Sequence, residues 1–406
     1  MAAVSFQGKG SMQKRVSALR NLRRLLSRTE YPPVEVAVKA GAISLLVQFL
    51  AFGSPDEQLL EASWCLTNIA AGNVEDPKAL LPALPMLIAH VGEKSSLPVA
   101  EQCAWALGNV ADKGSTVRTA AWALSNLIKG PDDRAATELI KIDGVLDGIL
   151  RHLKKSDEEL ATEVAWVVVY LSALSNVATN LLLKSDAIKL LVERLASSNN
   201  LQFLIPVLRS LGNLVAVDSH SRLVPGNEIT DGVVIVLVKC LKSEHRVLKK
   251  EAAWALSNIA AGPVEHKKMI ISSEALPCLL RLLGLAPFDI RKEVAYVLGN
   301  LCVGPTGDDG RPCLIQEHLV LLARSGCLSG FIDLVRSADV EAARLGLQFI
   351  ELVLRGMPNG EGPKLVEQED GIDAMERFQF HENDDLRNMA NGLIDKYFGE
   401  DYGLDE

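Results

Sequence analysis

Tryptophan and asparagine recur four residues apart in a series of similar apolar segments. The clearest pair is "EASWCLTNIAAG" at residues 61–72 and "EAAWALSNIAAG" at residues 251–262. All five tryptophans of the chain occupy the same position in such segments. Residues four apart on a helix lie on one face, one turn apart. The series therefore predicts a row of indole rings beside a row of side-chain amides.

Seven segments share this pattern, with a few exchanges by tyrosine or arginine. The two positions are Trp64/Asn68, Trp105/Asn109, Trp122/Asn126, Trp166/Tyr170, Arg209/Asn213, Trp254/Asn258 and Tyr296/Asn300. A polar residue also lies three positions before each of the six aromatic rings: Glu61, Gln102, Thr119, Glu163, Glu251 and Glu293. We call the three positions of one segment a rung.

These residue types could hold a basic peptide in an extended conformation. An asparagine side chain offers a donor and an acceptor, which an extended backbone can use. Helices about 8–10 Å apart would meet every second or third residue of a peptide that advances about 3.3 Å per residue. Neighbouring indoles form slots for lysine or arginine stems, each worth about 0.5–2 kcal/mol. The acids three positions earlier supply acceptors for the charged ends.

Simpler interpretations stay open for single residues. A tryptophan on an apolar helix is usually a core residue, and each asparagine alone could cap a loop carbonyl. The acids, Glu61 above all, could belong to solvated helix faces. Five tryptophans in one register favour a shared function over these alternatives.

The helices that must position these residues form repeats. The rungs are spaced 41 to 45 residues apart, except at one step, which is the period of armadillo and HEAT repeats. A second amphipathic helix and a polar break precede most rungs, as in "IDGVLDGILRHLKKSDEE". Units of this size cannot bury their apolar faces alone, so they must stack. We therefore predict an all-α fold, a right-handed armadillo-repeat superhelical solenoid.

The sequence predicts three regions. Residues 1–11 are expected to be a flexible N-terminus, and residues 399–406 an acidic tail. Residues 12–398 are expected to form an armadillo-repeat domain of about ten units, one of them truncated near residues 110–118. Inside this domain, "VGPTGDDGRP" (residues 303–312) is expected to be a loop without an element of its own.

Composition narrows the class of function. The formal net charge of −9 argues against nucleic acid as the main ligand and is compatible with a cationic partner. No apolar run reaches the roughly 18 residues of a membrane span. The seven cysteines are scattered without a C-x-x-C pair, which predicts buried, reduced thiols. No histidine spacing, phosphate loop or catalytic triad indicates a metal site, a cofactor or an enzyme.

The Trp–Asn series, the phrases "WALGNVA" and "WALSNLI", and the closing "HENDD…LIDKYFGED" resemble importin α. That family consists of armadillo adaptors that carry cargo with nuclear-localisation signals. The likeness covers nearly the whole chain, and "LGLQFIELVLRGMPNGE" is similar to a divergent plant member. It implies a cofactor-free import adaptor in cytoplasm and nucleus, which binds Lys/Arg-rich signal peptides along a concave Trp/Asn groove.

In this family the early repeats form a major signal site and the later repeats a minor one. The resemblance implies a major site of Trp64, Asn68, Gln102, Trp105, Asn109, Asp112, Trp122, Asn126, Glu163 and Trp166. It implies a minor site of Arg209, Asn213, Glu251, Trp254, Asn258, Glu293, Tyr296 and Asn300. Arg209 matches the arginine that interrupts the tryptophan row between the two sites.

Two departures from the family stand out. The step from Trp105 to Trp122 is only 17 residues, so two helices of about 25–30 residues are missing. The linker "DKGST" can barely span a helix length of about 15–18 Å. Asp112 lies one residue before the place of the aspartate that pairs with lysine in this family. We therefore expect a local defect in the major site. Residues 1–28 also do not match the family's basic importin-β-binding segment. Importin β is therefore expected as a partner only where such a segment is present, and an export receptor at the C-terminal repeats.

Two other functions stay open. A scaffold of the β-catenin or HEAT kind typically reads acidic or phosphorylated segments and needs a basic groove, which the acidic rung positions disfavour. A holder of basic proteins without an import role would use the same groove.

Overall fold

The computed structural model describes residues 11–28, 31–72, 77–91, 95–111, 116–129, 134–217, 228–306 and 312–399. The chain divides into two compact units, Met1–Leu181 and Leu182–Glu406, and each is described by itself. The expected flexible N-terminus lies outside the described residues up to residue 10, and the acidic tail from residue 400 onward. Asp112 also lies outside them.

The first unit is built from helices joined by short connections. They are α1 (Ser11–Leu26), α2 (Val34–Lys39), α3 (Ala42–Phe49), α4 (Asp56–Ala71), the 3-10 helix η1 (Pro77–Ala83), α5 (Leu84–Val91), α6 (Leu97–Ala111), α7 (Thr116–Ile128), α8 (Arg134–Lys141), α9 (Val145–Lys154) and α10 (Glu158–Leu174). Helix α11 (Asn176–Lys184) crosses the boundary between the units.

The second unit continues the same pattern of helices. They are α12 (Ala187–Ser197), α13 (Leu201–Val217), α14 (Glu228–Leu241), α15 (Arg246–Ala261), α16 (Val264–Ile271), α17 (Ala275–Leu285), α18 (Phe288–Leu301), α19 (Gln316–Arg324), α20 (Leu328–Val335), α21 (Val340–Gly356), the 3-10 helix η2 (Pro358–Gly360), α22 (Glu361–Gln368), α23 (Gly371–Glu376) and α24 (Asp384–Phe398). Two short strands, β1 (Val303–Thr306) and β2 (Pro312–Leu314), lie between α18 and α19. The predicted all-α class is confirmed.

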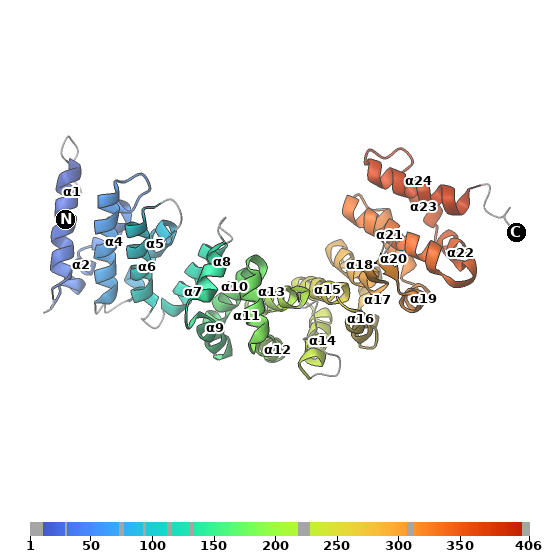
Figure 1. Cartoon of the computed structure of the whole chain (residues 1–406), viewed down its shortest axis with the longest axis horizontal. Helices are drawn as coiled ribbons and strands as arrows, with labels where there is room; N and C mark the ends of the chain where they lie inside the picture. Colours follow the sequence, from blue (N-terminus) through green and yellow to red (C-terminus); the bar gives the residue numbers. More distant parts are fainter. Residues whose placement is uncertain are drawn as a thin grey trace. The chain divides into compact units, whose positions relative to one another are not determined.

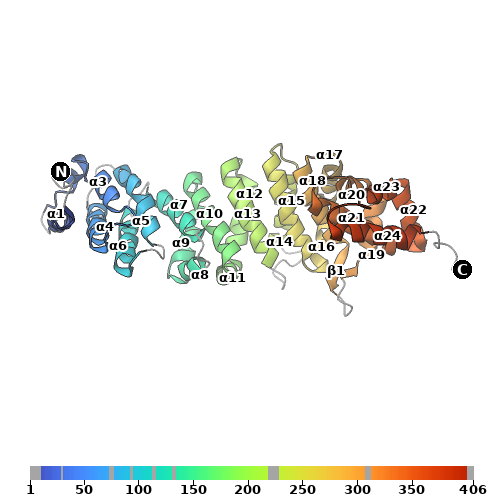
Figure 2. The ribbon, with the colours of Figure 1, turned by 90° about the horizontal axis from the view of Figure 1, so that it is seen from above.

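The helices that carry the rungs pack against one another within each unit. In the first unit α4 lies along α6, and α7 lies along α10 (Figure 1). In the second unit α13, α15 and α18 pack in succession, and α13 lies beside α15 in Figure 2. Each rung is therefore presented next to the rung of a neighbouring repeat, as the period predicts.

Polar breaks set where the helices begin. Asp157 accepts a hydrogen bond from the backbone N–H of Leu160 at 3.1 Å at the start of α10. Asp339 does the same with Ala342 at 2.8 Å at the start of α21. Both aspartates are N-caps, which satisfy backbone donors that the first turn leaves without partners. Gly144 precedes α9 with φ of 84°, a left-handed conformation that glycine adopts without steric cost.

Apolar side chains fill the space between the helices of each unit. Leu66 and Ile69 of α4 are fully buried in the first unit. In the second unit Phe331 and Phe349 stack with their ring centroids 3.8 Å apart. Six of the seven cysteines are buried and all are free thiols, as the sequence predicts, whereas Cys313 on β2 is exposed.

The prediction that residues 303–312 lack an element of their own is wrong. Strands β1 and β2 pair antiparallel, with Val303 opposite Leu314 and Thr306 opposite Pro312, and residues 307–311 lie outside the described part. The Leu314 side chain packs on α21, where Gly356 leaves room for it. Strand pairing and this apolar anchor outweigh the turn-forming composition of the segment.

Within the described ranges, no single helix is long and apolar enough to cross a membrane, although the bent pair α19 and α20 passes that test together, with an angle of 87°. The same ranges hold no group of three or more His, Cys, Asp or Glu side chains that could bind a metal ion.

Candidate peptide-binding site

In the second unit, two rung asparagines, Asn258 and Asn300, each donate a hydrogen bond to the preceding rung helix. The Nδ2 atom of Asn258 donates to the backbone oxygen of Gly212 at 3.1 Å. That of Asn300 donates to the backbone oxygen of Ser257 at 3.2 Å. Both acceptors lie inside helices, so these asparagines do not cap loops. An amide has two N–H groups and one carbonyl oxygen, so this bond orients the amide and leaves a donor and the acceptor for a peptide.

Trp254 is held against the neighbouring helix by a glycine. A methyl group at Gly212 would lie only 2.3 Å from Cζ3 of the Trp254 ring. The missing side chain therefore lets the indole approach the backbone of α13 closely. Trp254 is half-buried as a result, with part of its surface open to a groove.

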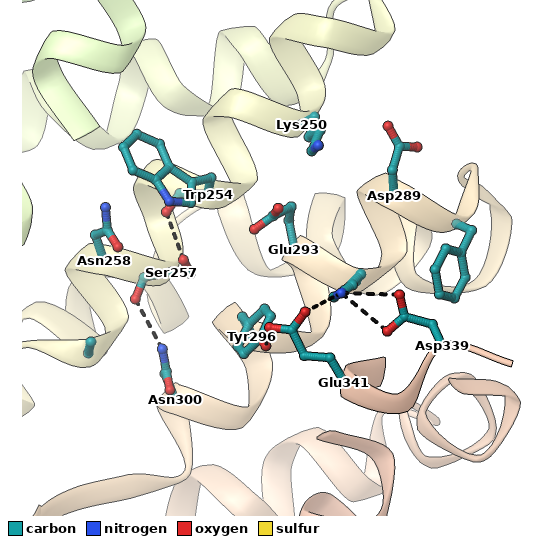
Figure 3. Close-up of a pocket in the computed structure, with 13 residues that line it drawn as sticks. Lys250, Trp254, Ser257, Asn258, Asp289, Glu293, Tyr296, Asn300, Asp339 and Glu341 are labelled. Atoms are coloured by element: carbon teal, nitrogen blue, oxygen red, sulfur yellow. Dashed lines mark hydrogen bonds and ion pairs between the residues drawn. The ribbon is translucent and has the colours of Figure 1, made fainter. Parts of the chain in front are cut away.

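This groove runs along α15, α18 and the start of α21 and has a volume of about 570 Å³. It combines aromatic rings, amides and carboxylates, which are the groups that the rungs were predicted to supply. Its lining residues are Lys250, Trp254, Ser257, Asn258, Ala261, Phe288, Asp289, Lys292, Glu293, Tyr296, Asn300, Asp339 and Glu341. Figure 3 shows most of these side chains converging from the three helices.

The two acidic rung positions of this unit differ in their partners. Glu251 is buried and accepts hydrogen bonds from Arg209, at 2.6 Å from Nη2 and 2.9 Å from Nε. Glu293 projects toward the space between Trp254 and Tyr296 (Figure 3), and no described cation forms an ion pair with it. Burial raises the pKa of Glu293 above its usual value, and nearby Glu251 adds to this although Lys250 opposes it. Glu293 is therefore a half-buried carboxylate that lacks a paired positive charge.

Five charged residues that line this groove were not predicted as site residues from the sequence: Lys250, Asp289, Lys292, Asp339 and Glu341. Lys292 forms ion pairs with Asp339 and Glu341 across α18 and α21, and Tyr296 donates its hydroxyl proton to Glu341. Glu341 lies three residues before Arg344, so α21 carries a further rung with arginine at the aromatic position. The β1–β2 segment lengthens the step from Tyr296 to Arg344 to 48 residues. Because this step exceeds the repeat period, the rung was not recognised in the sequence.

In the first unit, α4 and α6 are joined by the same kind of bond. The Nδ2 atom of Asn109 donates to the backbone oxygen of Thr67 at 3.3 Å, one residue before Asn68. The Nε2 atom of Gln102 donates to the Thr67 hydroxyl at 2.7 Å. Gln102 is thereby used inside the protein, whereas Trp105 is 66% exposed and free to form a slot wall.

Glu61 is neither an open acceptor nor a solvated residue. It is buried, and its carboxylate pairs with Arg23 Nε at 2.6 Å and Arg20 Nε at 3.2 Å. The Arg23 guanidinium also lies 4.2 Å from the centroid of the Trp64 ring. Arg23 precedes Trp64 by 41 residues, one repeat period, so α1 carries an additional rung with arginine at the aromatic position.

The short step between α6 and α7 changes the bonding of the next rung. The Nδ2 atom of Asn126 donates to the backbone oxygen of Trp122 in its own helix, at 2.9 Å. Helix α7 also packs less on α6 than on α10. The side chain of Thr119 lies outside the described part. Asn126 therefore lacks the bond to a preceding rung helix that Asn109 makes.

Helix α10 carries the last rung of the first unit. Trp166 and Tyr170 stack with their ring centroids 6.0 Å apart. Burial raises the pKa of Glu163, although Arg118 on α7 opposes this shift. Arg118 itself forms an ion pair with Glu159. Like Glu293, Glu163 is a half-buried acid beside an aromatic rung position.

Solved structures similar to this chain share its fold. A crystal structure of an engineered protein aligns with a TM-score of 0.60 at 22% identity and covers 96% of both chains. A designed armadillo repeat protein in complex with the peptide (KR)4 aligns with a TM-score of 0.52 at 22% identity, over 61% of this chain and 96% of that one.

Sequence comparisons identify the repeats and the family. The Armadillo/beta-catenin-like repeat family matches residues 31–71, 229–261 and 263–303, and the Atypical Arm repeat family matches residues 364–406. Importin subunit alpha-9 of Arabidopsis thaliana is 68% identical over 433 positions, which cover 100% of this chain and 83% of that protein. Importin subunit alpha-2 of Oryza sativa subsp. japonica is 63% identical over 433 positions, which cover 100% of this chain and 82% of that protein.

Both alignments are longer than the chain. They extend over 433 positions against 406 residues, so about 27 positions of each relative have no counterpart here. This difference has the size of the two helices that the sequence predicts to be missing between Trp105 and Trp122. Together, the repeat matches and the identity of 68% and 63% over the whole of this chain show that it belongs to the importin α family of nuclear import adaptors.

Proposed function

We propose that the second unit of this chain is its principal docking surface for cargo, and that it binds an extended Lys/Arg-rich nuclear-localisation signal along α15 and α18. The asparagines Asn258 and Asn300 would hold the peptide backbone. Trp254 and Tyr296 would flank the aliphatic stems, and Glu293 would receive a charged end.

The observation that carries this proposal is the carboxylate of Glu293. A half-buried carboxylate without a paired cation is unfavourable, as its raised pKa reflects. It lies in a groove of about 570 Å³ between two aromatic rings and two oriented amides. A peptide ammonium or guanidinium group would remove this penalty, whereas an acidic segment would increase it. The charge of the groove thus favours a basic peptide over the acidic ligands of a β-catenin-like scaffold.

We propose that the first unit binds such peptides more weakly. Arg23 already stacks on the Trp64 ring, which stays 36% exposed, and Glu61 is paired with Arg20 and Arg23. The α6–α7 step, where Asn126 bonds within its own helix, would interrupt the row of backbone clamps. Trp105, Trp122 and Trp166 remain as slot walls, so residual binding is expected there. Asp112, which lies outside the described residues, has no assigned role.

The test is a titration of a fluorescently labelled monopartite basic peptide, followed by anisotropy. Asn258→Ala combined with Asn300→Ala should weaken binding about 10–30-fold, because each lost backbone hydrogen bond is worth about 1 kcal/mol. Asn388→Ala on α24, an exposed site away from the groove, is the matched control and should bind like wild type. Equal affinity of the double variant and the control would refute the proposed docking surface.

A second experiment addresses the short step. Inserting the roughly 27 residues that the relatives carry between α6 and α7 should tighten binding of a bipartite peptide and leave a monopartite peptide unchanged. A Gly/Ser insert of equal length is the control, since it restores the spacing without restoring the helices. If both inserts act alike, the missing helices do not limit the first unit.

We propose further that residues 12–398 act as the repeat domain and that the protein moves between cytoplasm and nucleus. Importin β would bind through a basic segment preceding the repeats, where one is present, and an export receptor would bind the C-terminal repeats. Co-precipitation of importin β with this 406-residue chain would contradict that dependence on the additional segment.

A further inference from the structure

Lys292 places a positive charge of the protein itself at one end of the groove. It precedes Tyr296 by one turn of α18, and its side chain reaches across to α21. The Nζ atom lies 3.2 Å from Oδ1 and 3.3 Å from Oδ2 of Asp339, and it also contacts Glu341. The ammonium group thus bridges the two carboxylates, which Figure 3 labels, and Tyr296 donates to the other oxygen of Glu341.

The two carboxylates are satisfied by these contacts. The backbone N–H of Ala342 and the ammonium of Lys292 hold the pKa of Asp339 below its usual value. Hydrogen bonds from Lys292 and Tyr296 do the same for Glu341. Burial alone would lower the pKa of Lys292, but its bonds to Glu341 and Asp339 raise it. All three groups are therefore held in their charged forms, in contrast to the unpaired Glu293.

Helix α21 lies less closely against α18 than α18 does against α15. The Lys292 side chain spans this wider step and is only 20% exposed, whereas the carboxylates of Asp339 and Glu341 are 37% and 60% exposed. The acids thus face the groove, and the lysine covers them from the side of α18. A cation arriving from solution would have to compete with the Lys292 ammonium for these carboxylates.

We propose that Lys292 is an internal competitor that shields Asp339 and Glu341 from basic peptides, and so limits how many cationic residues the second unit reads. This inference rests on the proposed peptide-binding function. With Lys292 in place, the cation-binding part of the groove ends at Glu293. Without it, Asp339 and Glu341 become a further subsite for one lysine or arginine.

The test compares two peptides on the full chain. One is a short basic peptide that spans α15 and α18, and the other carries two additional lysines at each end. Lys292→Met should bind the longer peptide about tenfold tighter than wild type, since two partly exposed carboxylates become available. The short peptide should gain less than about threefold, and Lys292→Arg should resemble wild type.

Two controls separate this effect from bulk charge and from misfolding. Lys268→Met removes the same charge from an exposed pair with Glu265 on α16 and should leave both affinities unchanged. Adding Asp339→Asn to Lys292→Met should remove part of the gain, because asparagine keeps the helix cap but leaves only the Glu341 charge in the subsite. If wild type binds both peptides and Lys292→Met gains nothing for the longer one, the inference is wrong. If wild type binds neither peptide, the proposed function itself fails.

Discussion

Replacing Glu293 with glutamine separates the binding role of this residue from its effect on folding. Glutamine keeps the size and the polar end of the side chain and removes only the charge. In the free protein Glu293 is half-buried and has no ion pair with a described cation. The variant should therefore bind a basic peptide more weakly while being at least as stable as wild type.

The loss of affinity follows from the position of the carboxylate. At about 4 Å and an effective dielectric constant near 20, a peptide cation and a carboxylate attract each other by about 4 kcal/mol. Desolvation of both groups offsets part of this, and fully exposed pairs retain about 1 kcal/mol or less. Breaking a buried pair costs about 2–5 kcal/mol. A half-buried site lies between these limits, so we expect a loss of about 1.5–2 kcal/mol, or about 10–30-fold in Kd.

The affinity for a basic peptide should depend on pH, in a direction set by the raised pKa of Glu293. The raised pKa of Glu293 means that the carboxylate takes up a proton at a higher pH than free glutamate. A cationic peptide binds the ionised form, so the affinity of wild type should fall as the pH is lowered through this raised pKa. The affinity of Glu293→Gln should change less over the same range. Isothermal titration calorimetry between pH 4.5 and pH 7.5, on samples checked for folding, measures both.

Stability should respond in the opposite direction to binding. Because the folded state holds the Glu293 proton more tightly than the unfolded state, the ionised residue lowers stability at neutral pH. Glu293→Gln should therefore raise the free energy of unfolding at pH 7, and this gain should vanish as the pH falls from the raised pKa to that of an unfolded glutamate. A variant that is less stable at pH 7 and binds peptide as tightly as wild type would refute both parts of the reasoning.

Two further substitutions test the packing described above. Gly212→Ala should lower the free energy of unfolding by about 1–3 kcal/mol and weaken peptide binding, because its methyl group would displace the Trp254 ring. The matched control is Gly284→Ala, whose added methyl group would meet nothing within 4 Å. Urea unfolding should show this control to be neutral or stabilising. Lys267 is buried between the carbonyls of two helix ends, and burial lowers its pKa to about 8. The unfolded lysine keeps its proton to a higher pH than the folded one. The free energy of unfolding of wild type, relative to that of Lys267→Met, should therefore rise by about 1–2 kcal/mol between pH 8 and pH 10. A stability difference that stays constant over this range would show that the pKa of Lys267 is not lowered.

The repeat architecture could be predicted from the sequence because its signals are local. Tryptophan and asparagine spaced four apart require one helix face, and polar breaks mark where helices begin. Asp157 illustrates this, since it lies in the "KSDEE" break and caps α10 as that pattern suggests. The positions of the rungs on their helices could therefore be predicted without a three-dimensional structure.

The partners of the acidic positions could not be predicted in the same way. Glu61 was expected either to line the groove or to face solvent, and it is buried against Arg20 and Arg23 from the preceding repeat. A pairing of this kind depends on how two helices about 40 residues apart are placed side by side. The sequence did contain one indication of this pairing, because Arg23 and Ser27 lie one repeat period before Trp64 and Asn68.

The rung on α21 was missed for a different reason. The β1–β2 segment adds residues between α18 and α19, so the repeat period no longer points to Glu341 and Arg344. The same segment was expected to be an irregular loop. Its glycines and prolines do predict turns, but the pairing of β1 with β2 depends on an apolar contact with α21 that the local composition does not reveal.

The sparse α6–α7 contact also has a consequence for how the first unit unfolds. In a linear array of repeats, stability is close to the sum of each repeat's own stability and the coupling between nearest neighbours. At this step Asn126 is bonded within its own helix, so the coupling is weak. Helices α1 to α6 and helices α7 to α10 should then open as separate cooperative blocks with different hydrogen-exchange protection. Any ordering that a peptide imposes on one block would stop at this step instead of spreading along the unit.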